Sequence, residues 1–270
     1  MARRLLAMAV IMSGLMVAGV AVRAVTFGEP DGMRHPYVGT IIFRTATGYY
    51  SCSGTLLSPG VLLTAGHCTE EGGVVNLKTW AKFSPAISFA GAGEYPSFAA
   101  YLDDKRNGWV EGTAVPHPQY DDYAQFPATY DVGVVLLKRR VVMDTYGVLP
   151  PQGFLRGVRS AADNLFTVVG FGMQGYIRPF YEDNYERYQG QVRLVELNST
   201  WDGGMSAKFT NNPGIGGGSC YGDSGGPVFY GRSNMVVAVV SWGNTPCIGV
   251  DYQFRVDTPI ALDFLHQYIR

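Results

Sequence analysis

The sequence has little charge and few of the residues that bind metals. Only 16% of its 270 residues are charged, and the net charge of −1 leaves no basic excess of the kind that binds nucleic acid. It contains four cysteines and four histidines but no C-x-x-C pair, which argues against a zinc site. Internal repeats and low-complexity runs are absent, while 47% of the residues are apolar. This composition predicts a globular protein with a large core.

The first 24 residues differ in composition from the rest of the chain. Arg3 and Arg4 precede an apolar run from Leu5 to Val22, and small residues follow. This order is typical of a signal peptide, so we predict cleavage near Ala24 and a secreted, extracellular protein. The alternative is an uncleaved membrane anchor, because the run is long enough to span a bilayer.

Export would make the four cysteines disulfide partners. Four cysteines allow three pairings, and the residues alone do not choose among them.

Short strand-like runs dominate the remaining sequence. They are rich in Val, Ile, Phe and Tyr, and glycine, proline, asparagine or serine bounds each of them. The clearest lie at 37–43, 53–58, 61–65, 131–137, 165–172, 191–197, 226–230 and 235–243. A helix is predicted only at about 258–269, where Asp257 or Thr258 can cap the first turn and Pro259 fits it. The fold class is therefore all-β with a C-terminal α-helix.

Two residues at the ends of apolar runs are candidates for chemistry. In "LLTAGHCTE", His67 follows a strand-like run, and in "ATYDVGVVLLKR", Asp131 begins one. A carboxylate at the entrance to a buried strand is costly unless it is paired or hydrogen-bonded. We therefore predict that Asp131 orients His67, whereas Asp121 and Asp122 lie in a polar loop and are solvated. His35 and His117 precede prolines in loops and are predicted to lie at the surface.

The stretch "CYGDSGGPVF" carries the candidate nucleophile, Ser224. Glycines around it allow the hydroxyl to be exposed and backbone amides to approach a substrate closely. The residues also match G-x-S-x-G, the nucleophile motif of α/β-hydrolases, in which the order is serine, acid, histidine. Here the order is His67, Asp131, Ser224, and no alternating strand–helix pattern exists. The match to the hydrolase motif is therefore accidental.

The motifs "TAGHC", "YDVGVVLL", "GDSGGP" and "VVSWGN" together resemble the chymotrypsin-like (trypsin-like, S1) family of serine proteases. The resemblance covers nearly all of the chain after the first 24 residues. It implies two six-stranded antiparallel β-barrels, an N-terminal one at about 25–150 and a C-terminal one at about 160–256, with the site in the cleft between them.

The resemblance also implies roles for individual residues. His67, Asp131 and Ser224 would form the catalytic triad, and the amides of Gly222 and Ser224 the oxyanion hole. Further residues would bind substrate or form disulfides: Gly218, Ser219, Ser241, Trp242 and Gly243 for substrate, and the pairs Cys52–Cys68 and Cys220–Cys247.

A further implied role concerns Asp223, which in the family pairs with an amine exposed by processing. The segment "AVTFGEPDGMRHPYVG" departs from the family's usual start, and no long pro-segment separates it from the signal. We therefore expect signal removal to expose Val25, whose amine pairs with Asp223.

The resemblance also places Gly218 and Ser219 at the base of the pocket and Gly243 at its wall. Because none of them is charged, it implies cleavage after bulky neutral side chains. A basic preference is the alternative, because Asp251 lies near the pocket in sequence. The predicted protein is a monomeric serine endopeptidase that needs no cofactor or metal. Its partners are protein or peptide substrates and protein inhibitors, with no nucleic acid and no stable membrane association. The rival interpretations are an inactive protease-like binding protein and an esterase of the same fold.

Overall fold

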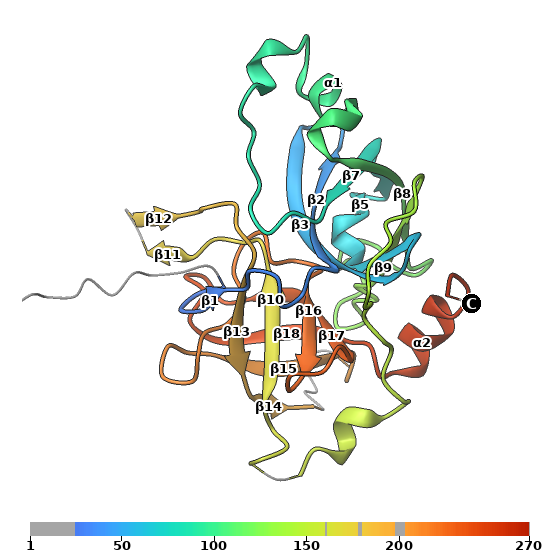
Figure 1. Ribbon diagram of the computed structural model, residues 1–270. Coiled ribbons are helices and arrows are strands. Elements are labelled where there is room, and N and C mark those ends of the chain that lie inside the picture. Colours follow the sequence, from blue (N-terminus) through green and yellow to red (C-terminus); the bar gives the residue numbers. More distant parts are fainter. Residues whose placement is uncertain (1–24, 160, 178–179, 198–202, 270) are drawn as a thin grey trace, which may run out of the picture.

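The computed structural model describes residues 25–159, 161–177, 180–197 and 203–269 (Figure 1). The predicted signal peptide, or anchor, at residues 1–24 lies outside the described residues. Within those described ranges, no helix is both long enough and apolar enough to cross a membrane.

Six strands close into a barrel in the order β2-β3-β4-β9-β8-β7. Their bounds are β2 (Val38–Arg44), β3 (Tyr49–Ser58), β4 (Val61–Thr64), β7 (Lys78–Lys82), β8 (Val110–Pro116) and β9 (Gly133–Leu137). All of β4 and nearly all of β2 are buried, which explains their continuous apolar sequences. A small hairpin of β5 (Glu70–Glu71) and β6 (Val74–Val75) follows β4 along the chain.

The second half of the chain, together with β1 from its start, forms an eight-stranded sheet in the order β1-β13-β10-β16-β17-β18-β15-β14. Its strands are β1 (Glu29–Pro30), β10 (Phe166–Gly170), β13 (Tyr188–Val192), β14 (Leu194–Glu196), β15 (Ser206–Asn211), β16 (Pro227–Tyr230), β17 (Val236–Gly243) and β18 (Gly249–Arg255). A separate ribbon pairs β11 (Gly175–Ile177) with β12 (Phe180–Glu182). The all-β fold class is confirmed. The second unit has two edge strands, β1 and β14, beyond the six expected, and its hydrogen bonding does not close into a ring in the part of the chain described.

The first described residues pair with the second sheet before the chain forms the barrel. Glu29 and Pro30 of β1 pair with β13, and Thr26 forms an isolated bridge with Gly218. Asp31 then accepts hydrogen bonds from the buried Arg187 side chain (2.8 Å) and from the backbone N–H of His35 (3.0 Å). The start of the described chain is thus held against the second sheet.

The prediction that His35 and His117 lie at the surface is wrong, because both are about 8% exposed. The Nδ1 atom of His35 lies 2.5 Å from an Asp31 oxygen, and its ring stacks on Phe229. The ring of His117 stacks on Tyr130, with the two centroids 5.2 Å apart. Both rings gain partners from distant strands and loops that their local sequence does not reveal.

Helices are few and short. The predicted C-terminal helix is α2 (Pro259–Leu265), and the Thr258 hydroxyl caps it by accepting a hydrogen bond from the N–H of Ala261. A second helix, α1 (Phe98–Asp103), was not predicted, and the described residues also contain four 3-10 turns: η1 (Gly66–Cys68), η2 (Ala92–Glu94), η3 (Lys105–Asn107) and η4 (Phe154–Gly157).

Helix α1 belongs to a segment between β7 and β8 that we call the aromatic insert, residues 83–109. Figure 1 shows it as the green segment beyond one end of the barrel. It packs around Trp80, Trp109 and Phe171, the last of which comes from the second half of the chain. The aromatic insert therefore contacts both halves of the molecule.

Candidate active site

The pairing of β4 with β9 brings His67 to Asp131. Thr64 lies opposite Gly133 in this antiparallel pair, so the turn after β4 and the residues before β9 meet at one end of the barrel. The Oδ1 atom of Asp131 accepts a hydrogen bond from the backbone N–H of His67 (2.9 Å), and Oδ2 lies 3.0 Å from Nδ1 of the ring. Because the Nδ1 atom faces a carboxylate, it carries the proton, and Nε2 is left as the basic atom.

Asp131 is fully buried and receives two further donors. The hydroxyl of Tyr123 donates to Oδ2 at 2.7 Å, and the Ser241 hydroxyl donates to the same oxygen. Burial alone would raise the pKa of Asp131, but the charge of His67 and the hydrogen bonds from His67 and Ser241 hold it below its ordinary value. For His67, burial acts to lower the pKa, and the Asp131 carboxylate outweighs it, so the net pKa is raised.

Ser224 lies in a loop whose conformation depends on glycine. Gly222 has φ +95° and Gly225 has φ +76°, a region that side-chain-bearing residues rarely adopt. Ser53 of β3 fixes the loop from the barrel: its N–H donates to the carbonyl of Ser224 (2.7 Å), and its hydroxyl donates to the carbonyl of Gly222 (3.0 Å). The barrel that carries His67 therefore also positions Ser224.

Ser224 and His67 line the same cavity, of about 910 Å³, which we call the large cavity. The loop beside it presents two backbone donors. Within the described ranges, the N–H groups of Gly222 and Ser224 donate to no protein acceptor. Free amides beside the partly buried Ser224 are able to bind an oxygen atom that carries developing negative charge.

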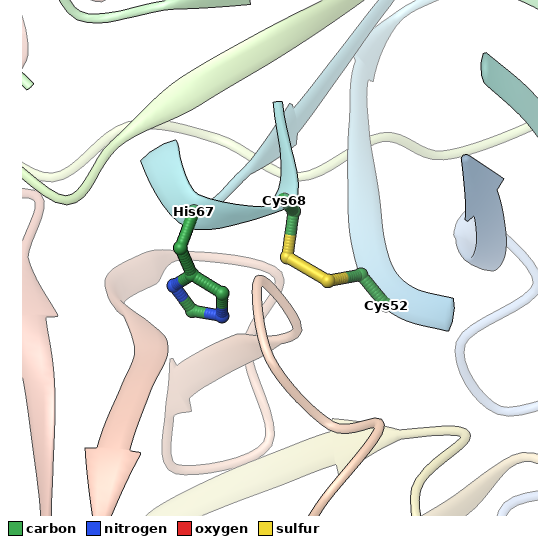
Figure 2. A group of neighbouring side chains, drawn as sticks. All are labelled: Cys52, His67 and Cys68. Atoms are coloured by element: carbon green, nitrogen blue, oxygen red, sulfur yellow. A yellow bond between two sulfur atoms is a disulfide. The ribbon is translucent and has the colours of Figure 1, made fainter. Parts of the chain in front are cut away.

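Two disulfides brace these loops: Cys52–Cys68 and Cys220–Cys247. Figure 2 shows the first beside the imidazole of His67. The two sulfurs and the His67 ring lie close together, as the ligands of a metal would. Each sulfur is bonded to the other, however, so neither is a thiolate, and Nδ1 of His67 is engaged by Asp131. This cluster does not have the donor set of a metal site.

A second space, the small cavity of about 210 Å³, also reaches Ser224. Its lining includes the predicted substrate-binding residues Ser219, Ser241, Trp242 and Gly243. Gly218 is buried and lies off the cavity wall, because its backbone pairs with Thr26 and the Asn211 side chain packs on it.

Asp251 does line the small cavity. The pairing of β17 with β18 places it opposite Gly243. Ser219 donates to its Oδ2 atom through both N–H and hydroxyl, each at 2.7 Å, and the amide of Asn211 donates at 3.0 Å. Burial raises the pKa of Asp251 to about 6, so the carboxylate is ionised above neutral pH.

Asp223 is a third buried carboxylate, with no cationic partner among the described side chains. It accepts hydrogen bonds from the N–H groups of Gly172 (2.8 Å) and Cys220 (2.9 Å), and burial raises its pKa to about 7. The backbone N–H of Gly218, just before the Asp223 loop, donates to the carbonyl of Thr26 at 3.2 Å. Val25, the next residue toward the N-terminus, is fully buried.

The sequence did not point to three of these contributors. Tyr123 lies in a loop read as solvated, Ser53 is a strand residue with no motif around it, and Asn211 reaches Asp251 across the sheet. Only Asp251 gave a signal, its nearness in sequence to the predicted pocket. Ser53 and Asn211 act through contacts with segments far apart in the chain, whereas Tyr123 reaches Asp131 from within the same loop region.

Comparison with known proteins identifies the family and the fold of the chain. The family model described as "Trypsin" matches residues 27–265. A trypsin of Phaedon cochleariae is 28% identical over 206 residues, which cover 72% of this chain and 69% of that protein. The phenoloxidase-activating enzyme of Bombyx mori is 27% identical over 74% of this chain, and the match spans about half (49%) of that longer relative.

Solved structures show the same fold at lower identity. HL collagenase aligns with a TM-score of 0.65 and 17% identity, covering 89% of this chain and 96% of that one. The structure titled GrC aligns with a TM-score of 0.63 and 18% identity, again over 89% and 96%. The match to the family model over residues 27–265 shows that the chain belongs to the trypsin family of serine proteases.

Proposed function

We propose that the protein is a secreted serine endopeptidase that cleaves peptide bonds through an acyl-enzyme on Ser224. The observation that carries the proposal is the hydrogen-bonded pair of Asp131 and His67 in the wall of the cavity that holds Ser224. Its macromolecular partners would be protein or peptide substrates and protein inhibitors, and it would act as a monomer.

The residue types define the chemistry. As the Ser224 Oγ atom attacks the substrate carbonyl, its proton passes to Nε2 of His67. The negative charge on the carbonyl oxygen is held by the N–H groups of Gly222 and Ser224. His67 then returns the proton to the leaving nitrogen as the C–N bond breaks, and water, activated by the same imidazole, releases the acyl group. Asp131 stabilises the imidazolium that forms between these steps.

Two substrates, a casein-type protein and a small ester, distinguish the three candidate functions. An endopeptidase hydrolyses both, an esterase only the ester, and an inactive binding protein neither. Absence of peptide-bond cleavage by the folded, mature protein would refute the proposal.

Activity is expected to rise with pH. His67 acts as a base only when neutral, and its pKa is raised above the ordinary value of about 6.5. The acidic limb of kcat/KM should therefore have its midpoint above 6.5, with the active form accumulating at higher pH. A kcat/KM that stays flat from about pH 5 to 9 would contradict a histidine base.

The acyl-side preference has two candidate forms. The sequence predicts bulky neutral side chains, whereas the place of Asp251 in the small cavity favours basic ones. We expect Asp251→Asn to reduce kcat/KM after Lys or Arg by roughly thirtyfold or more, because a buried charged partner is lost, and to change cleavage after Phe little. The measurement compares anilides of Arg and Phe at pH 8, where Asp251 is ionised. An unchanged ratio would leave neutral side chains as the preference.

Asp223 is proposed to receive the amine of a mature N-terminus at Val25. The support is the burial of Val25 next to the bridge between Thr26 and Gly218, which precedes the Asp223 loop. Blocking that amine should lower activity by about a hundredfold or more, because one partner of a buried pair is removed. N-terminal sequencing of the active protein, followed by assay with a blocked amine, is the test. A start well downstream of Val25, or full activity when blocked, would exclude the pairing.

A further inference from the structure

Ser224 lines both the large and the small cavity, and the two cavities differ in their other lining residues. His67 lines the large cavity but not the small one. In the proposed reaction the leaving nitrogen takes its proton from His67, so it must depart on the side where His67 lies. The large cavity therefore faces the part of the substrate that follows the scissile bond, and the small cavity faces the acyl side.

The walls of the large cavity carry several aromatic rings that pack on one another. The ring of Phe98 lies 5.1 Å from that of Tyr49 and 5.7 Å from that of Phe89, between centroids. Phe89 also meets Tyr185 edge to face at 5.5 Å. Tyr49 and Tyr185 remain 37% and 49% exposed, so apolar surface is left for a ligand to cover.

The aromatic insert is tied in place at this wall. Ala86 forms a bridge with Glu186, and the N–H of Ile87 donates to the carbonyl of Tyr185 at 2.8 Å. The Tyr101 hydroxyl donates to the carbonyl of Ser88 at 3.0 Å. The rings are therefore held in position before any substrate arrives, which lowers the entropy cost of binding.

The charge of the large cavity is of one sign. Four carboxylates line it, those of Glu70, Glu71, Asp122 and Asp183, and no lysine or arginine does so among the described residues. None of the four forms an ion pair in the described part of the chain. Burial raises the pKa of Glu70, and the neighbouring Asp122 adds to that effect. An acidic side chain entering this space meets like charge, and a basic one meets opposite charge.

We propose that the large cavity selects the residues that follow the scissile bond, favouring large aromatic or basic side chains and rejecting acidic ones. This proposal rests on the proposed peptidase function and names the substrate class of its leaving side. The aromatic insert supplies the selecting wall, together with Tyr49 of the barrel and Tyr185.

The test uses internally quenched peptides that share one acyl side and carry Phe, Lys, Ala or Glu at each of the first three positions after the cleaved bond. We expect kcat/KM for the best Phe or Lys peptide to exceed that of the Ala peptide by about tenfold, and the Glu peptides to be the poorest. Tyr49→Ala should remove most of the preference for Phe, and Tyr49→Phe should keep it. Glu71→Gln should weaken the discrimination between Lys and Glu, while Glu94→Gln, an exposed glutamate outside the cavity, should not.

An anilide with the same acyl side serves as the control, since it has no residues after the cleaved bond. Its hydrolysis should be unchanged in Glu94→Gln, and thermal unfolding of all four variants checks that they are folded. A flat profile across Phe, Lys, Ala and Glu, with the anilide cleaved normally, overturns this inference and leaves the proposed function intact. Failure of the wild type on both the anilide and every peptide defeats the proposed function, and this inference with it.

Discussion

Ser224→Ala should reduce kcat on a peptide substrate by about a million-fold, the scale of loss when the nucleophile of such a triad is removed. The reason is local. The Ser224 Oγ atom is the attacking group, and its backbone is held independently by the bond from the Ser53 N–H to the Ser224 carbonyl. Alanine keeps that bond and the free amides, so the change removes the nucleophile and leaves the loop in place.

The measurement is hydrolysis of a casein-type protein and of a peptide anilide by purified mature protein. Ser233→Ala, in an exposed turn between β16 and β17, is the matched control and should retain wild-type rates. Thermal unfolding of both variants checks that the fold is intact. Proteolysis by Ser224→Ala within about a hundredfold of wild type would show that another group carries the reaction.

The second large effect is expected for Asp131→Asn, which should lower kcat about ten-thousandfold. The amide oxygen of asparagine would occupy the Oδ1 position, where it accepts the hydrogen bond from the backbone N–H of His67. The NH₂ group would not occupy that position, because two donors would then face each other. Its NH₂ group would then face Nδ1 of His67. That contact makes Nδ1 the acceptor and puts the proton on Nε2, which then cannot take the proton of Ser224.

Tyr123→Phe is the matched comparison, because it removes one of the hydrogen bonds to Asp131 but keeps the carboxylate. The kcat of Tyr123→Phe should fall by about tenfold or less, the usual scale of a single hydrogen bond. Steady-state kinetics on an anilide between pH 7 and 9 separate the two variants. A kcat for Asp131→Asn within tenfold of wild type would mean that Asp131 does not set the tautomer of His67.

The motif residues could be located from the sequence because each follows or precedes an apolar strand. The ends of β4 and β9 are easily recognised, and their pairing brings His67 to Asp131. The glycines around Ser224 also mark its loop. In these cases a local pattern is sufficient, since strand ends and glycine turns are encoded within a few residues.

The contributions that the sequence did not reveal depend on register or on packing between distant segments. Asp251 reaches the small cavity because β18 pairs in one register with β17, and a shift of one residue would turn its side chain to the other face. The aromatic residues of the insert have no regular period, so neither their helix nor their place in the wall of the large cavity could be predicted. Tyr123 lies 118 residues from Ser241, which shares Asp131 with it.

Reaction with a fluorophosphonate, followed by peptide mapping of the adduct, asks whether this geometry activates one particular serine. The reagent phosphonylates a serine hydroxyl, with loss of fluoride, only when a neighbouring base activates that hydroxyl. We expect one adduct per chain, located on Ser224 and lost when His67 is replaced by alanine. Failure of the folded, mature protein to form an adduct on Ser224, or labelling that persists without His67, would contradict this expectation.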